Sequence, residues 1–280
     1  MTLDSLLARY IRSVMTSTRY QESLRRTVRR AAVYGLTQTC QLTPDAVNEF
    51  LEKMRRSGRT GDTTRHNIRR ELLTLWRYAF DEGITKEMVV RVRKVPARFA
   101  PPTAYSFTDL VEMLRKADLD QTPISTRVAI TRREILPVWL TVGYETGLRL
   151  GDLLKLRTED YRNGCLVVRA NKTGKVITRR LSAESQKRFE RLCDLSPDGS
   201  VFLWALPRRR AIHTWKAFLS ANGYQGGTQW LRRSGATHLD RLRPGMATLW
   251  LDHSNPQLAR KHYIDGTLIE APPTPPPLEG

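Results

Sequence analysis

Apolar residues recur at helical spacing along most of the first ninety residues. The stretch 62–83 shows this well, because Ile68, Leu72, Leu75 and Trp76 fall on one face of a helix. Residues 1–90 are therefore expected to form a bundle of four helices. These helices are predicted over residues 3–15, 20–36, 43–58 and 62–83.

Residues 91–105 interrupt this periodicity with several prolines and basic residues. Such a composition is typical of an extended linker between domains. A basic linker would suit a protein whose two domains hold opposite sides of one duplex. A surface loop inside a single domain is the alternative interpretation.

Helical spacing resumes at Ser106, which forms the pattern of a capping box with Asp109. The stretches 164–170 and 175–181 flank a turn at Thr173–Gly174 and predict a β-hairpin. Residues 106–265 are thus expected to form a second domain, mainly helical with a small antiparallel sheet, and residues 266–280 a proline-rich tail. Its helices are predicted over residues 106–117, 132–147, 150–161, 182–194, 209–223, 229–242 and 256–263.

The chain is strongly basic. It carries 47 Lys and Arg residues against 28 Asp and Glu residues, a net charge of +19. This excess favours a polyanionic partner, most simply nucleic acid, over a basic surface that is only solvated. Because the net charge is +10 in residues 1–100 and +9 in the rest, both domains are expected to contact the polyanion.

Several arginines of the first domain are expected to face DNA phosphates, although a solvated helix face is the alternative for some of them. These residues are Arg25, Arg26, Arg29, Arg65, Arg69 and Arg70.

The three cysteines are scattered and form no CxxC pair. They indicate reduced thiols, not a disulfide framework or a zinc site. The N-terminal residues lack the long apolar core of a secretory signal, and no apolar run is long enough to span a membrane. The expected location is the cytoplasm, on the nucleoid when the protein is bound to DNA.

Five residues of the second half carry the side chains that phosphate chemistry uses. In chain order they are Arg149, Lys172, Arg232, His253 and Tyr263. Each has an ordinary explanation when taken alone, since arginines usually lie on surfaces and a tyrosine usually packs in a core. Taken together in so basic a chain, they suit a site that binds a phosphate.

The segments around these residues resemble the motifs of the tyrosine recombinase (phage integrase) family. "TGLRLGDLLKL" is similar to the box of the first catalytic arginine, which the resemblance puts at Arg149, with a supporting acid at Asp152. "NKTGK" resembles the hairpin that presents the catalytic lysine, which is Lys172 or, as a rival candidate, Lys175.

Two further segments complete the resemblance. "QWLRRSGAT" is similar to the box of the second arginine, Arg232, beside which Arg233 is expected to contact DNA. "LDHSNPQLARKHY" resembles the last box, with the histidine at His253 and the nucleophile at Tyr263. The family histidine that opens the second-arginine box is Gln229 here, and this residue can hydrogen-bond a phosphate but cannot take up a proton near neutral pH. The glycine before His253 is replaced by Asp252, which could orient the histidine or cap a helix.

The resemblance implies a mainly α fold in two domains that clamp duplex DNA. Residues 1–90 would be a helical core-binding domain, 91–105 the linker, 106–265 a mixed α/β catalytic domain and 266–280 a tail that could dock on a neighbouring subunit. The implied partners are double-stranded DNA with specific recombination sites and further copies of this chain, four on DNA. No membrane partner is expected.

The residue types suit transfer of a DNA phosphate. Arginine forks bond two phosphate oxygens and stay charged at working pH, and fixed donors of this kind stabilise the charge that develops in the transition state. A phenol, with an ordinary pKa of about 10, is more easily ionised beside two arginines. The resulting phosphotyrosine conserves the bond energy, so no cofactor is expected, neither a metal ion nor ATP.

The sequence therefore predicts a site-specific tyrosine recombinase that forms a 3′-phosphotyrosine intermediate, in DNA integration, excision or resolution. Two alternatives stay open. One is a DNA-binding or architectural protein on the same fold whose catalysis is impaired by Gln229, and the other is a nicking-closing enzyme like a type IB topoisomerase.

Overall fold

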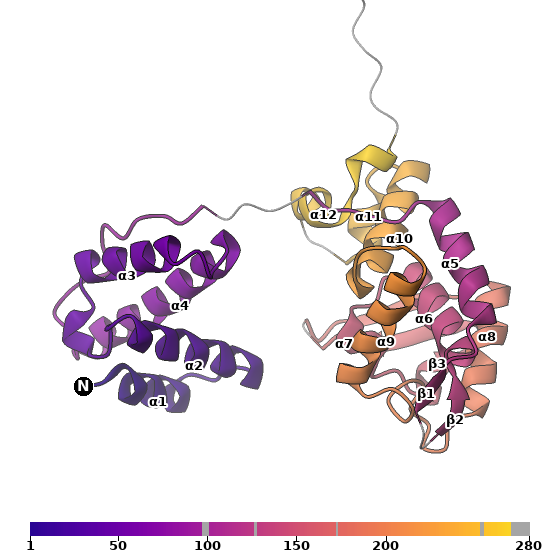
Figure 1. The fold of residues 1–280 in the computed structure, drawn as a ribbon, viewed down its shortest axis with the longest axis horizontal. Helices are drawn as coiled ribbons and strands as arrows, with labels where there is room; N and C mark the ends of the chain where they lie inside the picture. Colours follow the sequence, from indigo (N-terminus) through magenta and orange to yellow (C-terminus); the bar gives the residue numbers. More distant parts are fainter. Residues whose placement is uncertain (97–100, 126–127, 172, 253–254, 270–280) are drawn as a thin grey trace, which may run out of the picture. The chain divides into compact units, whose positions relative to one another are not determined.

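The computed structural model describes residues 1–96, 101–125, 128–171, 173–252 and 255–269 (Figure 1). The chain divides into two compact units, Met1–Ala100 and Pro101–Gly280. Each unit has a hydrophobic core of its own, so each is described by itself.

The described part of the first unit contains four α-helices, which coincide with the predicted stretches to within a few residues. They are α1 (Leu3–Ser13), α2 (Thr18–Val33), α3 (Pro44–Arg56) and α4 (Asp62–Asp81), with a 3-10 turn at Thr39–Gln41. The buried carboxylate of Glu71 on α4 accepts hydrogen bonds from Ser23 at 2.6 Å and Thr27 at 2.5 Å on α2. Its two hydroxyl partners offset the cost of burying that charge.

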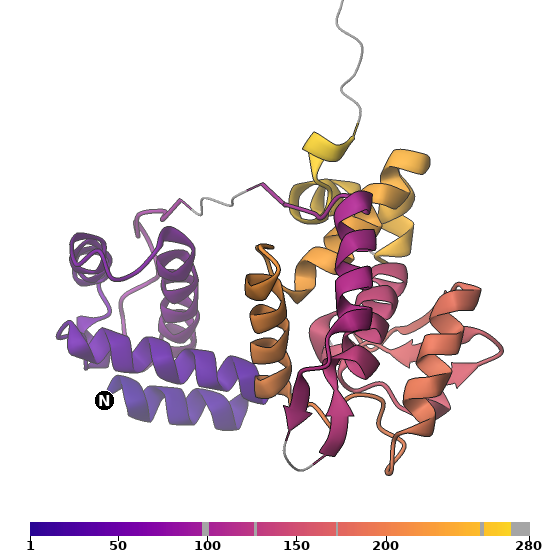
Figure 2. The ribbon, with the colours of Figure 1, turned by 45° about the vertical axis from the view of Figure 1, so that its right-hand side comes forward.

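The second unit is built around α6 (Arg132–Thr146), which is buried on most faces. Helices α5 (Phe107–Leu119), α8 (Ala183–Asp194) and α10 (Thr228–Leu242) pack against α6, and Figure 2 shows α5 alongside it. Trp139 of α6 also stacks on Trp215 of α9, with ring centroids 6.1 Å apart. The other helices of the described part are α7 (Leu150–Leu153), α9 (Arg208–Ala221), α11 (Met246–Trp250) and α12 (Pro256–Tyr263), with 3-10 turns at Thr158–Asp160 and Gly266–Leu268.

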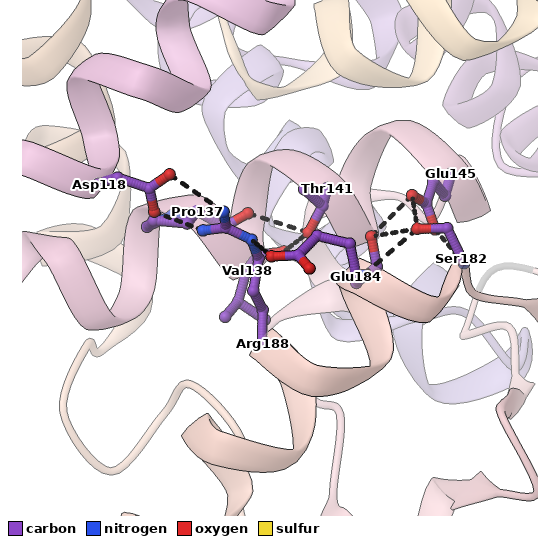
Figure 3. Close-up of polar contacts among 9 residues, drawn as sticks. Asp118, Pro137, Val138, Thr141, Glu145, Ser182, Glu184 and Arg188 are labelled. Carbon is purple, nitrogen blue, oxygen red and sulfur yellow. Dashed lines mark hydrogen bonds and ion pairs between the residues drawn. The ribbon is translucent and has the colours of Figure 1, made fainter.

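Polar contacts fix α8 on its neighbours (Figure 3). Arg188 of α8 makes a forked ion pair with Asp118 of α5 and also contacts Glu184. Ser182 and Ser185 donate to the carboxylate of Glu145 of α6, at 2.7 Å each. These contacts join α5, α6 and α8 to one another.

The predicted hairpin is present. Strands β4 (Cys165–Arg169) and β5 (Val176–Arg180) pair antiparallel, with Leu166 opposite Arg179. A short strand β3 (Tyr161–Arg162) extends the sheet in the order β3-β4-β5. The capping box of Ser106 and Asp109 and the end of α6 at Gly147, in the left-handed conformation with φ of 60°, are also confirmed.

Three features differ from the sequence prediction. The helix expected over 150–161 ends at Leu153, because the residues after it form a 3-10 turn and then pair with β4 as strand β3. A hairpin of strands β1 (Pro123–Ser125) and β2 (Val128–Thr131) was not predicted. Helix α11 was missed too, since its five residues are too few to show helical spacing.

Candidate functional site

The second unit buries an arginine whose fixed partners are backbone carbonyls. Arg232, on α10, is 4% exposed. Its guanidinium donates to the carbonyl oxygens of Gly147 and Leu251, the latter at 3.3 Å. Its Nε is buried without a hydrogen-bond partner, and no carboxylate of the described residues pairs with it. A buried cation satisfied in this incomplete way suits a site that receives an anion.

The surroundings of Arg232 raise the energy of its charge. The pKa of Arg232 is lowered to about 10 in all. Burial is the main cause, the phenol of Tyr263 acts in the opposite direction, and the charges of Arg149 and Arg179 contribute to the lowering. The side chain is still a cation at neutral pH. Three guanidiniums and a phenol thus influence one another in one part of the unit, which gives a positive potential, and no Asp or Glu of the described residues forms an ion pair with Arg232.

Tyr263 is both packed and close to this charge. It is the last residue of α12, 9% exposed, in a small core with Ala236, Leu251 and Ala259. The guanidinium of Arg232 lies over its ring, 5.0 Å from the ring centroid. The backbone next to Tyr263 is fixed by Thr237, which donates to its carbonyl at 3.3 Å.

The segment after Tyr263 is anchored to the start of the unit. The buried carboxylate of Asp265 accepts hydrogen bonds from the backbone of Ala104 at 2.9 Å and of Thr267 at 3.0 Å. Burial alone would raise the pKa of Asp265, but these hydrogen bonds, that of the Thr267 hydroxyl and the charge of Arg233 lower it overall. The position of α12 therefore depends on a carboxylate that is ionised at neutral pH.

Arg149 lies in the turn between α6 and α7, and Asp152 lies within α7. Arg149 has extended backbone, with φ of −69°, and begins α7. Asp152 is 3% exposed, and one of its carboxylate oxygens accepts from the backbone N–H of Asn171 at 3.0 Å and from its side-chain amide at 2.8 Å. Asp152 thus fixes the end of β4, next to the turn of the hairpin, instead of contacting Arg149 through its side chain.

Two of the predicted site residues, Lys172 and His253, lie outside the described residues. Their surroundings are described in part, since Lys175 pairs with Asp252 at 3.2 Å. This ion pair joins the hairpin to the segment that leads to His253. Asp252 has a left-handed backbone, with φ of 55°.

Gln229 is exposed in the first turn of α10, three residues before Arg232. Arg233 is half-buried with its Nε unpaired among the described atoms.

Two residues that the sequence analysis did not select also belong to this region. Arg179 of β5 donates to the carbonyl of Trp250, and its guanidinium lies 5.9 Å from the centroid of the Trp250 ring. One indication of this was present in the sequence, because successive side chains of a strand point to opposite faces, so only one of Arg179 and Arg180 could face the rest of the unit. The sequence did not tell which face meets α11, since α11 itself was not predicted.

The predicted DNA-facing arginines of the first unit have different surroundings. Arg25, Arg26, Arg29 and Arg70 are exposed. Arg65 pairs with Asp62, and Arg69 donates to the carbonyls of Val92 at 3.0 Å and Arg93 at 2.7 Å. Arg65 and Arg69 therefore already make contacts within the first unit.

Solved structures show what the whole chain is similar to. A lambda integrase dimer bound to a COC′ core site matches with a TM-score of 0.74 and 17% identity over 99% of this chain and 81% of that one. The Tn1549 transposon integrase in complex with circular intermediate DNA matches with a TM-score of 0.73 and 15% identity over 94% of this chain and 95% of that one.

A third structure is the XerH site-specific recombinase bound to a palindromic difH substrate, with a TM-score of 0.68 and 18% identity over 86% of this chain and 74% of that one. No protein-family model and no curated protein matches the chain. At these identities the likeness shows a common fold. In the described ranges, no helix has the length and apolar character needed to cross a membrane.

Proposed function

We propose that this chain, which has the fold of the tyrosine recombinases, is a site-specific recombinase that cleaves and rejoins DNA through Tyr263. The observation that carries the proposal is the buried guanidinium of Arg232. It lacks a carboxylate partner among the described residues, lies over the ring of Tyr263, and is close enough to Arg149 and Arg179 for their charges to lower its pKa.

The proposed reaction has two balanced steps. The phenol of Tyr263 gives its proton to a water molecule, its oxygen attacks the scissile phosphorus, and the bond from phosphorus to the 5′-oxygen breaks. Arg149, Arg232 and His253 donate to the non-bridging oxygens, where charge develops. Lys172 gives a proton to the 5′-oxygen, so a free hydroxyl leaves. In the second step a 5′-hydroxyl of another strand gives its proton to Lys172 and attacks the phosphotyrosine, and the phenolate of Tyr263 leaves and regains a proton from water.

The partner would be duplex DNA with a specific recombination site. The net charge of +19 supports a polyanion, and the three similar structures are of proteins bound to DNA. A lambda integrase tetramer bound to a Holliday junction matches this chain with a TM-score of 0.74. We infer that this chain also assembles on DNA as a tetramer, in the cytoplasm.

A nicked suicide substrate tests the proposal. After cleavage, the short fragment that carries the free 5′-hydroxyl diffuses away, so religation stops and the protein remains attached to the DNA. The protein–DNA adduct then migrates more slowly than free DNA on a denaturing gel. The wild-type protein is expected to form this adduct and Tyr263→Phe is not. Absence of an adduct with the wild type would favour a DNA-binding protein without catalysis. Relaxation of supercoils without strand exchange between two sites would favour a nicking-closing enzyme.

A further inference from the structure

The hairpin of β4 and β5 is held from both of its strands. On the β4 side, Asp152 accepts two hydrogen bonds from Asn171. On the β5 side, Arg179 donates to the carbonyl of Trp250, and Lys175 pairs with Asp252 at 3.2 Å. The segment Trp250–Asp252 directly precedes His253 in the chain. The hairpin, whose turn includes Lys172 in the sequence, is thereby joined to the segment Trp250–Asp252, which precedes His253.

Trp250 is the centre of these contacts. A Cβ added to Gly147 would lie 2.5 Å from its ring, and one added to Gly235 would lie 2.7 Å from it. The ring therefore fills the space between the end of α6, two residues before Arg149, and α10, three residues after Arg232. The guanidinium of Arg179 lies 5.9 Å from the centroid of the same ring. One side chain thus contacts the surroundings of both arginine motifs and the hairpin.

The segment Trp250–Asp252 has more contacts to hold it in place than the β5 strand has to hold it on that segment. The segment Trp250–Asp252 is also held by Arg232, which donates to the carbonyl of Leu251 at 3.3 Å, and by the burial of Leu251. The β5 strand reaches the same segment through Arg179 and Lys175. The Lys175–Asp252 pair is exposed, and exposed pairs contribute little. Arg179, in contrast, is half-buried, and its guanidinium both donates to a carbonyl and lies over a ring.

We propose that Arg179 is a positioning residue that fixes the β5 side of the hairpin against Trp250 and so supports protonation of the leaving 5′-oxygen, the step assigned above to Lys172. This inference rests on the function proposed above. Loss of Arg179 would leave the segment before His253 in place and β5 paired with β4, but β5 would lose its half-buried contact with that segment. The step that suffers would then be protonation of the leaving 5′-oxygen, more than attack by Tyr263.

A sulfur substitution separates these two steps. In a substrate whose bridging 5′-oxygen is replaced by sulfur, the leaving group is a thiolate. Because thiols have a pKa near 8.5, far below that of an alcohol, the thiolate departs without first being protonated. General acid catalysis typically contributes 10²–10⁴-fold. Arg179→Ala is therefore expected to slow cleavage of the oxygen substrate by at least about tenfold, while it cleaves the sulfur substrate at close to the wild-type rate.

Matched variants complete the experiment. Arg180→Ala removes an exposed arginine from the opposite face of the same strand, and it should keep the wild-type ratio of sulfur to oxygen rates. Lys172→Ala should show the same selective loss as Arg179→Ala. Arg179→Lys keeps the charge but not the forked donor, so it should resemble Arg179→Ala, and it supplies the test if the alanine variant does not fold.

The possible results are distinct. Equal slowing of Arg179→Ala on both substrates, or wild-type rates for it on both, would overturn the positioning role. Wild-type behaviour of Arg179→Lys would overturn it too, because the charge alone would then suffice. If the wild-type protein forms no adduct with either substrate, the proposed function itself fails.

Discussion

Replacement of Arg232 by methionine should remove activity without the loss of stability that most buried substitutions cause. Arg232 is 4% exposed, and its donors serve the carbonyls of Gly147 and Leu251. Methionine has a similar length, carries no charge and packs adaptably. The variant Arg232→Met therefore separates the use of this side chain as a cation from its use as buried volume.

The magnitude follows from the pKa. A pKa lowered from 12.5 to about 10 means that burial of the cation costs about 3 kcal/mol, since each unit corresponds to about 1.4 kcal/mol. Methionine removes this cost but leaves two carbonyls without a donor, at about 1 kcal/mol each. The free energy of unfolding should thus stay within about 1 kcal/mol of wild type or rise. The adjacent control Leu231→Ala, equally buried, should lose about 2–5 kcal/mol.

Urea unfolding followed by tryptophan fluorescence gives the assay, because five of the six tryptophans lie after residue 100. Sulfate is then added as a probe for the phosphate site. Sulfate at about ten times its dissociation constant should stabilise the wild type by about 1.4 kcal/mol, and Arg232→Met should lack most of that gain. DNA cleavage should fall by about 10²–10³-fold.

The reasoning would be refuted if Arg232→Met lost 3 kcal/mol or more and still gained stability from sulfate. In that case Arg232 would be a structural donor to the two carbonyls, and the anion would bind elsewhere.

Three further predictions concern single positions. Gln229→His should leave adduct formation unchanged or faster, because an imidazole can share the proton of the nucleophile; a large fall would mean that this motif is misaligned. Gly235→Ala should cost about 1–3 kcal/mol in urea unfolding, because its Cβ would lie 2.3 Å from the carbonyl of Tyr144, whereas Gly227→Ala, with open space around it, should not. Asp265→Asn should reduce the free energy of unfolding at pH 7. Because the pKa of Asp265 is lowered in the folded state, its carboxylate stabilises the fold above the unfolded-state pKa, and this stabilisation is lost as the pH falls through the folded-state pKa. The difference from wild type should therefore shrink below about pH 4.

Regular helices were predictable because their spacing is a local property. Helix α4 repeats its apolar residues over 20 residues, and α12 begins at Pro256 with Asn255 as its cap. Helix α11 has only five residues after a left-handed Gly245, so its apolar residues give no period. The residues after the end of α7 at Leu153 are held by long-range backbone contacts, since Thr158 donates to the carbonyl of Gly199 and Val201 donates to that of Leu156.

The site was predictable only in part. The order of Arg149, Arg232 and Tyr263 is visible in the chain, but the burial of Arg232 is not, because its carbonyl partners come from Gly147 and Leu251, far apart in sequence. The contact of Asp152 with Asn171 is also tertiary. Such features depend on how helices pack, which residue patterns do not encode locally.

The most direct measurement of the central claim is the chemical identity of the DNA-linked residue. After reaction with a nicked suicide substrate, digestion of the adduct with nuclease and protease should leave one modified peptide, and mass spectrometry should place a nucleotide phosphate on the oxygen of Tyr263. A nucleotide on another residue, or an adduct that persists in Tyr263→Phe, would contradict the account.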